Sequence, residues 1–306
     1  MLAQFFYDVH YSIELMSILH KKFKSKYWQS LRKLMDDESP AVRSALLTEL
    51  ANNSKESKEF LENLIQEKND ILAKHAISLI EDLGWNDGVG NFLKFIRSQR
   101  YELESGWFLL DRTIFPNFEI SAASLFLDQL ADRVRELLTP PQNAREICAV
   151  LNRILFHEYG FRGAIKDFND PQNSFLHLVL KRKRGLPITL CVVYLLVARR
   201  VSLDLEPIGL PGRFMLGSFT DDEPFYIDVW SGGKFYDIDE MEDFLGELVS
   251  DNSGASLLPV TVAETLTRGC RNLVQQFAKV DNHSNSDLFQ KFVNEFEDVH
   301  RREASA

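Results

Sequence analysis

The sequence predicts an α+β fold, in which a buried helix packs against an antiparallel sheet and helical segments flank this core on both sides. Three observations support this class. Residues 1–98 carry helical periodicity throughout, and residues 188–197 would be apolar on every side of a helix. Between residues 206 and 238 the apolar residues then alternate with a period of two, which is typical of strands.

The first hundred residues contain two similar stretches at an offset of 30 residues, which begin at Leu31 and Leu61. Each stretch predicts a helix with apolar residues three apart, a polar turn and a second amphipathic helix. The pattern resembles two short HEAT-type repeats, which would offer a concave surface for binding another protein. The alternative interpretation is a helical cap that covers the next domain.

The remaining elements follow from periodicity and from the residues that interrupt it. Two glycines predict a break at residues 85–90, and Pro140-Pro141 predicts another. The predicted helices cover residues 91–100, 102–115, 122–138, 144–157 and 239–248, and the predicted strands cover residues 206–210, 213–219, 225–230 and 234–238. A polar linker at residues 251–256 precedes closing helices. We therefore expect a helical segment over residues 1–98, a core domain over 99–250 and a helical tail over 251–306.

The charge balance excludes some classes of partner. A net charge of −10 argues against non-specific binding to nucleic acid or to an anionic membrane surface. The basic run at residues 181–184 is interpreted as a solvated helix end. The apolar run at residues 190–198 is much shorter than the ~20 residues that span a bilayer. No leader sequence is expected, because Asp8 and Glu14 interrupt the apolar residues at the N-terminus.

The cysteines predict a reduced protein in the cytoplasm. Cys148, Cys191 and Cys270 are odd in number, widely spaced and without a CxxC pair, so neither a disulfide framework nor a thiolate zinc site is expected. The chain also lacks the glycine-rich phosphate loops, HExxH pair and calcium-binding loop that would indicate a nucleotide or a metal. No cofactor is predicted.

Several motifs occur in one order between residues 167 and 233. They are Asp167 to Leu176, Arg184-Gly185-Leu186-Pro187, Gly209 to Phe214, Tyr226-Ile227-Asp228 and Gly232-Gly233. Together they resemble the bacterial SirB-type proteins of the transglutaminase-like superfamily. The resemblance is dense from about residue 100 to 245 and weaker in the tail. Relatives carry tetratricopeptide-like helices there, and residues 266–277 resemble a shortened version.

The resemblance implies a catalytic site of cysteine, histidine and aspartate in that chain order. The cysteine supplies a thiolate nucleophile, the histidine moves the proton, and the aspartate fixes the imidazole tautomer. The matching positions here are Cys191, Arg213 and Asp228. Arg213 stands where SirB-type relatives commonly have histidine, and a guanidinium cannot accept a proton at neutral pH.

Arg213 and Asp228 are predicted to form a bidentate ion pair that closes the site. If the hairpin tip lies near residues 220–221, the two residues are almost opposite each other, and their side chains are neighbours on one face of the sheet. Cys191 lies four residues after Pro187, a natural first residue of a helix, and its neighbours on that face are apolar. It is interpreted as a small buried hydrophobic residue, with the nucleophile role as the alternative.

Three further residues are candidates near the cleft. His177 could replace the missing base, although a histidine on a helix face is more often an ordinary polar residue. Asn173 either lines the cleft beside residue 213 or helps Ser174 cap the next helix. Trp230 is the third candidate binding residue.

The leading hypothesis is a catalytically inactive transglutaminase-like protein that binds a protein or peptide. The rival is a thiol acyltransferase, amidase or peptidase that uses Cys191 as its nucleophile. A third possibility is a scaffold that binds its partner through the HEAT-like segment. Neither nucleic acid nor a membrane is an expected partner, and the sequence leaves the oligomeric state open.

Overall fold

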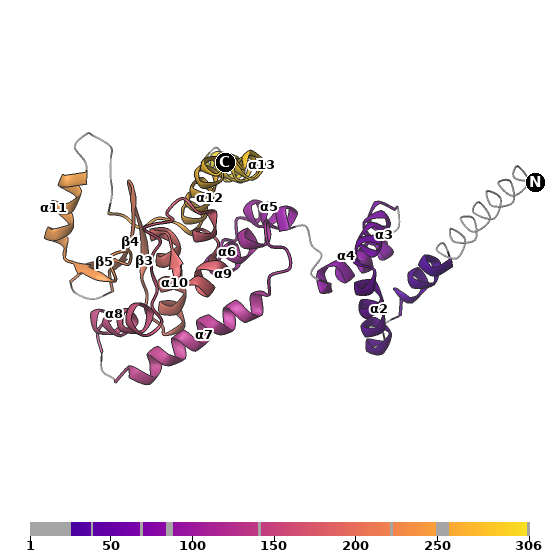
Figure 1. Ribbon diagram of the computed structural model, residues 1–306, viewed down its shortest axis with the longest axis horizontal. Coiled ribbons are helices and arrows are strands. Elements are labelled where there is room, and N and C mark those ends of the chain that lie inside the picture. The colour runs from indigo at the N-terminus through magenta and orange to yellow at the C-terminus, as the bar shows by residue number, and fades with distance from the viewer. Residues whose placement is uncertain are drawn as a thin grey trace, which may run out of the picture. The chain divides into compact units, whose positions relative to one another are not determined.

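The computed structural model describes residues 26–37, 39–67, 70–83, 88–139, 142–220, 223–248 and 257–304. The chain divides into two compact units, Met1–Asn86 and Asp87–Ala306 (Figure 1). The predicted linker at residues 251–256 and the Pro140-Pro141 stop lie outside the described residues.

All the regular secondary structure described in the first unit is helical. Its helices are residues 26–34, α2 (Pro40–Asn52), α3 (Ser54–Gln66) and α4 (Asp70–Asp82). Residues at the predicted offset share one core: Leu31 and Leu61 are both buried in it, as are Leu50 and Ile80. The sequence therefore located two similar helical hairpins, and their assignment to the HEAT type stays a prediction.

The second unit combines helices with two sheets. Its helices are α5 (Gly88–Ser98), α6 (Leu103–Arg112), α7 (Ile120–Leu137), α8 (Ala144–Asn152), the π-helical turn η1 (Arg153–Glu158), the 3-10 turn η2 (Pro171–Asn173), α9 (Leu176–Arg182), α10 (Pro187–Arg200), α11 (Ile238–Leu248), α12 (Val262–Lys279) and α13 (His283–Ala304). Its strands are β1 (Arg162–Gly163), β2 (Arg184–Gly185), β3 (Glu206–Leu210), β4 (Arg213–Ser218), β5 (Phe225–Asp228) and β6 (Lys234–Tyr236).

Helix α10 is the centre of this unit, as the sequence predicted. Pro187 starts it, because the missing N–H of proline costs nothing at the first helical position. Every residue from Ile188 to Ala198 is buried. A helix that is apolar on all sides is stable in water only when other elements cover it. Helix α10 packs mainly against α7 and β4, with smaller contacts to α9 and β2.

The larger sheet has the antiparallel order β3-β4-β5-β6 and two covered faces. Gly212, with φ of +66°, completes the two-residue connection between β3 and β4. One face packs against α10 and the other against α11, which lie on either side of the strands in Figure 1. The α10 face carries Phe214, Leu216, Phe225 and Ile227. The α11 face carries Ile208, Leu210, Met215 and Tyr226 around Met241.

Helix α5 belongs to the second unit, whereas the sequence placed it in an N-terminal segment ending at residue 98. Its Phe92 is buried edge-to-face against Phe292 of α13, at 4.9 Å between ring centroids. Gly88, which belongs to the predicted break at residues 85–90, instead begins α5. A Cβ atom there would collide with the Arg112 carbonyl, so the glycine permits close packing of α5 on the end of α6.

Candidate functional site

Arg213 and Asp228 form a short ion pair at one end of the β4–β5 hairpin. The Arg213 Nη2 donates to Asp228 Oδ2 at 2.6 Å, and Asp228 is fully buried. The predicted bidentate geometry is wrong, because the second carboxylate oxygen, Oδ1, accepts from the Ser231 backbone N–H at 3.2 Å. The Ser231 hydroxyl also donates to Oδ2, at 2.7 Å. The guanidinium instead lies 5.3 Å from the ring centroid of Phe244 on α11.

The strand register explains how these two residues meet. Leu216 pairs with Ile227 and Ser218 with Phe225, so Arg213 lies two positions away from the residue directly opposite Asp228. The two residues therefore lie nearly opposite each other, as predicted, with an offset of two residues because the loop is centred later along the chain than residues 220–221. A shift of two residues keeps both side chains on the same face, where diagonal neighbours remain within reach of a long side chain.

Cys191 lies on the other side of the sheet from this ion pair. It is fully buried on α10, and its thiol donates to the carbonyl oxygen of Phe214 at 3.5 Å. Burial raises the pKa of the Cys191 thiol well above its usual value, and the negative charge of Asp228 raises it further. The Arg213 side chain contacts α11 while Cys191 faces the α10 core, and among the described residues no hydrogen bond joins Cys191 to Arg213 or Asp228.

Arg268 of α12 is a positioning residue that the sequence analysis missed. Its Nη2 donates to the carbonyls of Leu210 at 2.6 Å and Arg213 at 2.8 Å, which flank the β3–β4 turn. Burial lowers the pKa of Arg268. The sequence offered little signal for this role, because Arg268 is two residues from both Leu266 and Cys270 and so lies outside the helix face that those two residues share.

Asn173 and Trp230 occupy structural positions. Asn173 is fully buried; its side-chain N–H donates to the Asp167 backbone carbonyl at 2.5 Å, and its own backbone carbonyl accepts from the Thr189 hydroxyl at 2.8 Å. Trp230 lies against Gly163 and meets Phe168 edge-to-face at 5.9 Å. No contact of either side chain with Arg213 occurs among the described residues.

His177 is held by Asp111, a residue that the sequence analysis also missed. The ring nitrogen Nδ1 lies 2.8 Å from Asp111 Oδ2. The same carboxylate accepts from the backbone N–H groups of Leu176 at 2.9 Å and His177 at 2.7 Å. Asp111 therefore caps α9, and the predicted cap by Asn173 or Ser174 is wrong. Burial raises the pKa of the Asp111 carboxyl, against the opposing effect of His177.

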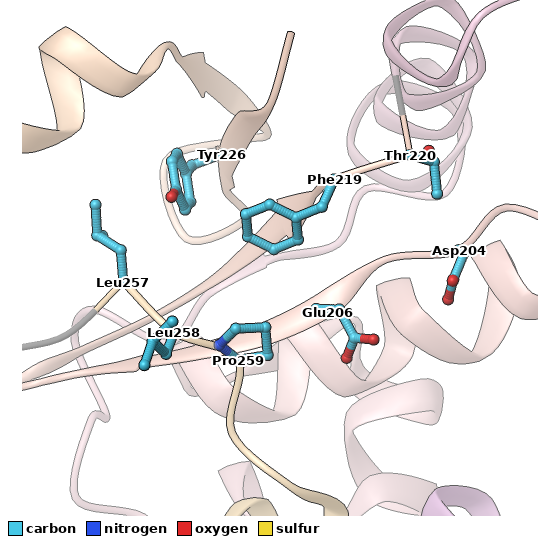
Figure 2. Close-up of a pocket in the computed structure, with 8 residues that line it drawn as sticks. All are labelled: Asp204, Glu206, Phe219, Thr220, Tyr226, Leu257, Leu258 and Pro259. Atoms are coloured by element: carbon cyan, nitrogen blue, oxygen red, sulfur yellow. The ribbon is translucent and has the colours of Figure 1, made fainter. Parts of the chain in front are cut away.

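The domain also has a groove on the α11 face of the sheet (Figure 2). Its volume is about 600 Å³. Its apolar lining comes from Phe219, Tyr226, Leu257, Leu258 and Pro259, and its polar lining from Asp204, Glu206 and Thr220. The aromatic rings of Phe219 and Tyr226 meet edge-to-face at 5.9 Å. The charged groups in the lining are the two carboxylates of Asp204 and Glu206, so the groove is suited to an apolar ligand with a positive charge.

The environment of the cysteines leads to a first prediction. All three thiols are buried, and only a thiolate reacts quickly with an alkylating reagent. We expect iodoacetamide at pH 7 to label none of Cys148, Cys191 and Cys270 in the native protein, and all three after denaturation in guanidinium, as counted by mass spectrometry. Fast native labelling confined to Cys191 would contradict the assigned environment.

Comparison with known proteins agrees with this architecture. Residues 121–271 match the family model of the transglutaminase-like superfamily. The chain contains a transglutaminase-like domain. Bacterial relatives are named UPF0162 protein: that of Xylella fastidiosa strain Temecula1 is 29% identical over 201 residues, 62% of this chain and 70% of the relative. That of Vibrio cholerae is 25% identical over 132 residues, 43% of this chain and 49% of the relative.

A eukaryotic protein shares part of the same region. The F-box only protein 21 of Mus musculus is 31% identical over 137 residues, which is 42% of this chain and 21% of that protein. No solved structure matches the chain. The SirB assignment stays a prediction beside the transglutaminase-like domain.

The described ranges contain neither a membrane span nor a metal centre. None of their helices is long and apolar enough to cross a bilayer. In the same ranges, no group of three or more histidine, cysteine, aspartate or glutamate side chains could hold a metal ion.

Proposed function

We propose that the transglutaminase-like domain of this chain is catalytically inactive as a thiol enzyme and binds a protein or peptide. The observation that supports the proposal is the burial of Cys191, whose thiol has no base in hydrogen-bond contact among the described residues. A thiol nucleophile requires a base within hydrogen-bond reach, and Cys191 instead donates to the carbonyl of Phe214. Its raised pKa also opposes formation of the thiolate.

The ion pair supports the same proposal. A guanidinium lacks the lone pair that proton transfer needs, and Asp228 is occupied by Arg213 and Ser231. The pair lies at the start of β4 and the end of β5, where it fixes the hairpin relative to α11. Arg213 and Asp228, at the matching triad positions, thus stabilise the fold of the domain.

The groove of Figure 2 is the proposed binding surface. It adjoins the outer edge of β3, where Val260 N–H donates to the Pro207 carbonyl at 2.8 Å and brings residues 257–259 alongside. Phe219 and Leu258 are exposed there, at 41% and 71%. Apolar side chains beside Glu206 and Asp204 would bind a peptide that carries a lysine or arginine next to an apolar residue.

Catalysis is tested by comparing wild type with Cys191→Ala and Arg213→His. The substrates are p-nitrophenyl esters and glutamine-containing peptides with a fluorescent amine acceptor. All three proteins should give the background rate, because a histidine at position 213 would still lie on the face opposite Cys191. Turnover in wild type that Cys191→Ala abolishes would refute inactivity, and a Cys191-dependent gain in Arg213→His would refute the separation of the two groups.

Binding is tested by selecting a random peptide library on the wild-type protein. Enriched peptides should combine a basic and an apolar residue, and Glu206→Lys should weaken their affinity by about tenfold or more, since it replaces attraction by repulsion. Glu136→Lys, at an exposed position on α7, is the matched control and should leave the affinity unchanged. Equal affinity of Glu206→Lys and Glu136→Lys for the peptides would show that the groove is not the binding surface.

A further inference from the structure

A cavity of about 390 Å³ lies between α7 and α9, the helices labelled in Figure 1. The start of α7 and the segment before it supply Phe118, Glu119, Ala122, Ala123 and Phe126, and α9 with the residues after it supplies His177, Leu180, Lys181 and Lys183. Its volume lies within the range of small-molecule sites in proteins. Neither the triad positions nor the groove of Figure 2 contributes a residue to it.

Lys183 presents an ammonium group to this cavity. Its backbone adopts the left-handed conformation, with φ of +58°, at the end of α9. The Nζ atom lies 3.5 Å from the ring centroid of Phe126 and 4.7 Å from that of Phe161, and it donates to the Leu180 carbonyl. The interpretation of the basic run at residues 181–184 as a solvated helix end is wrong for Lys183, because aromatic rings cover its side chain.

The charge of Lys183 is not matched by an acid. No ion pair joins it to a carboxylate within the described ranges, whereas Arg200, also partly buried, contacts both Glu104 and Asp128 at 2.8 and 2.6 Å. Burial therefore lowers the pKa of Lys183 to about 8. Removing an ammonium from water without a counter-charge is unfavourable, and an anion entering the cavity would offset that cost.

The end wall of the cavity is fixed by His177. Its ring is stacked on Phe118 at 4.6 Å, and Nδ1 bonds to the buried Asp111 at 2.8 Å. The bond from Nδ1 to the buried carboxyl and the stacking on Phe118 hold the ring plane before any ligand arrives. A wall fixed in this way reduces the entropy lost on binding.

We propose that this cavity binds a small carboxylate that carries an apolar body. The ligand's carboxylate pairs with the ammonium of Lys183, and its body packs on Phe126, Ala122 and Leu180. Lys181 adds a second positive charge at the rim, while Glu119 is the one acidic residue in the lining. The requirement for both a charge and an apolar surface distinguishes this ligand class from simple anions and from neutral hydrophobic molecules.

The affinity should depend on pH through Lys183. Glu119, Lys181 and His177, with Asp111 behind it, also face the cavity. Lys183 binds a carboxylate in its protonated form and loses that proton near pH 8. The affinity for a carboxylate is therefore expected to be steady around pH 7 and to fall by up to about tenfold per pH unit above 8. In Lys183→Met this alkaline fall should disappear.

The test uses phenylacetate as the probe, titrated into the full-length protein at pH 7 by calorimetry and by ligand-observed NMR. We expect saturable binding at one site, and at least about tenfold weaker binding of the neutral phenylacetamide, because the ion pair contributes roughly 1.4 kcal/mol or more. Lys183→Met should weaken phenylacetate binding by a similar factor. Lys166→Met, at an exposed position nearby in the sequence, should not.

Three results would overturn the proposal. The first is absence of saturable binding by phenylacetate up to about 10 mM, near the weak limit of specific sites. The second is equal affinity for phenylacetate and phenylacetamide, which would mean that the cavity recognises only the apolar body. The third is unchanged binding by Lys183→Met while circular dichroism shows that the variant is folded.

Discussion

Replacing Asp111 with alanine is expected to destabilise the second unit by about 3–5 kcal/mol, because one buried and two partly buried donors lose their common acceptor. These donors are the backbone N–H groups of Leu176 and His177 and the Nδ1–H of His177. Alanine cannot accept any of them, and Asp111 is fully buried, so water does not replace the carboxylate. Urea unfolding followed by tryptophan fluorescence measures the loss, and hydrogen exchange should show the largest increase in α9.

Two variants make this expectation specific. Asp111→Asn preserves the shape and one oxygen but presents an amide nitrogen to the donors, so its cost should be intermediate. Asp132→Ala, on the exposed side of α7 where Asp132 pairs with Arg135, should change stability by less than about 0.5 kcal/mol. If Asp111→Ala were as mild as Asp132→Ala, the carboxylate would not be the cap of α9.

The parts of the fold that were predictable are those encoded by neighbouring residues. Helix α10 could be located because Pro187 starts it and its following residues are apolar on all sides. The strand β3 was predicted with its observed bounds, since the alternating pattern ends at Pro211-Gly212. The burial of Cys191 was also expected from the apolar residues on its helix face. In each case the information lies within a few residues of the element.

The contacts that were missed join residues far apart in the sequence. The N-terminus of α9 is capped by Asp111 from α6, and local cap preferences for Asn173 and Ser174 could not reveal an acceptor from another helix. The signal available was an acidic residue four positions after the buried Trp107, on the apolar face of α6. Sequence periodicity does not say which distant donor such a buried carboxylate serves.

At the candidate site, the contact between Arg213 and Asp228 was predicted but its geometry was not. The pairing of Arg213 with Asp228 followed from the hairpin, while the single contact between them depends on Ser231, which occupies the second carboxylate oxygen. The separation of Cys191 from the pair follows from which face of the sheet α10 and α11 cover. That choice is made by tertiary packing, because β4 and β5 carry apolar residues on both faces.

Replacing Arg213 with methionine is expected to cost about 3–5 kcal/mol, because it leaves the buried Asp228 without a cation. Asp228→Leu should be less harmful, at about 1–3 kcal/mol, since Arg213 is 31% exposed in its side chain and can turn its charge toward water. The exposed Ser231 can likewise bond to solvent. Chemical denaturation of both variants under identical conditions tests this asymmetry.

The double variant Arg213→Met/Asp228→Leu separates the ion pair from the burial of a lone charge. With both charges replaced by apolar groups, no uncompensated carboxylate remains, so the double variant should be about 2 kcal/mol or more stable than Arg213→Met alone. Simple addition of the two single losses would show that the residues act independently. A cost for Asp228→Leu above that for Arg213→Met would mean that the carboxylate's bonds to Ser231, and not its pairing with Arg213, hold the end of the hairpin.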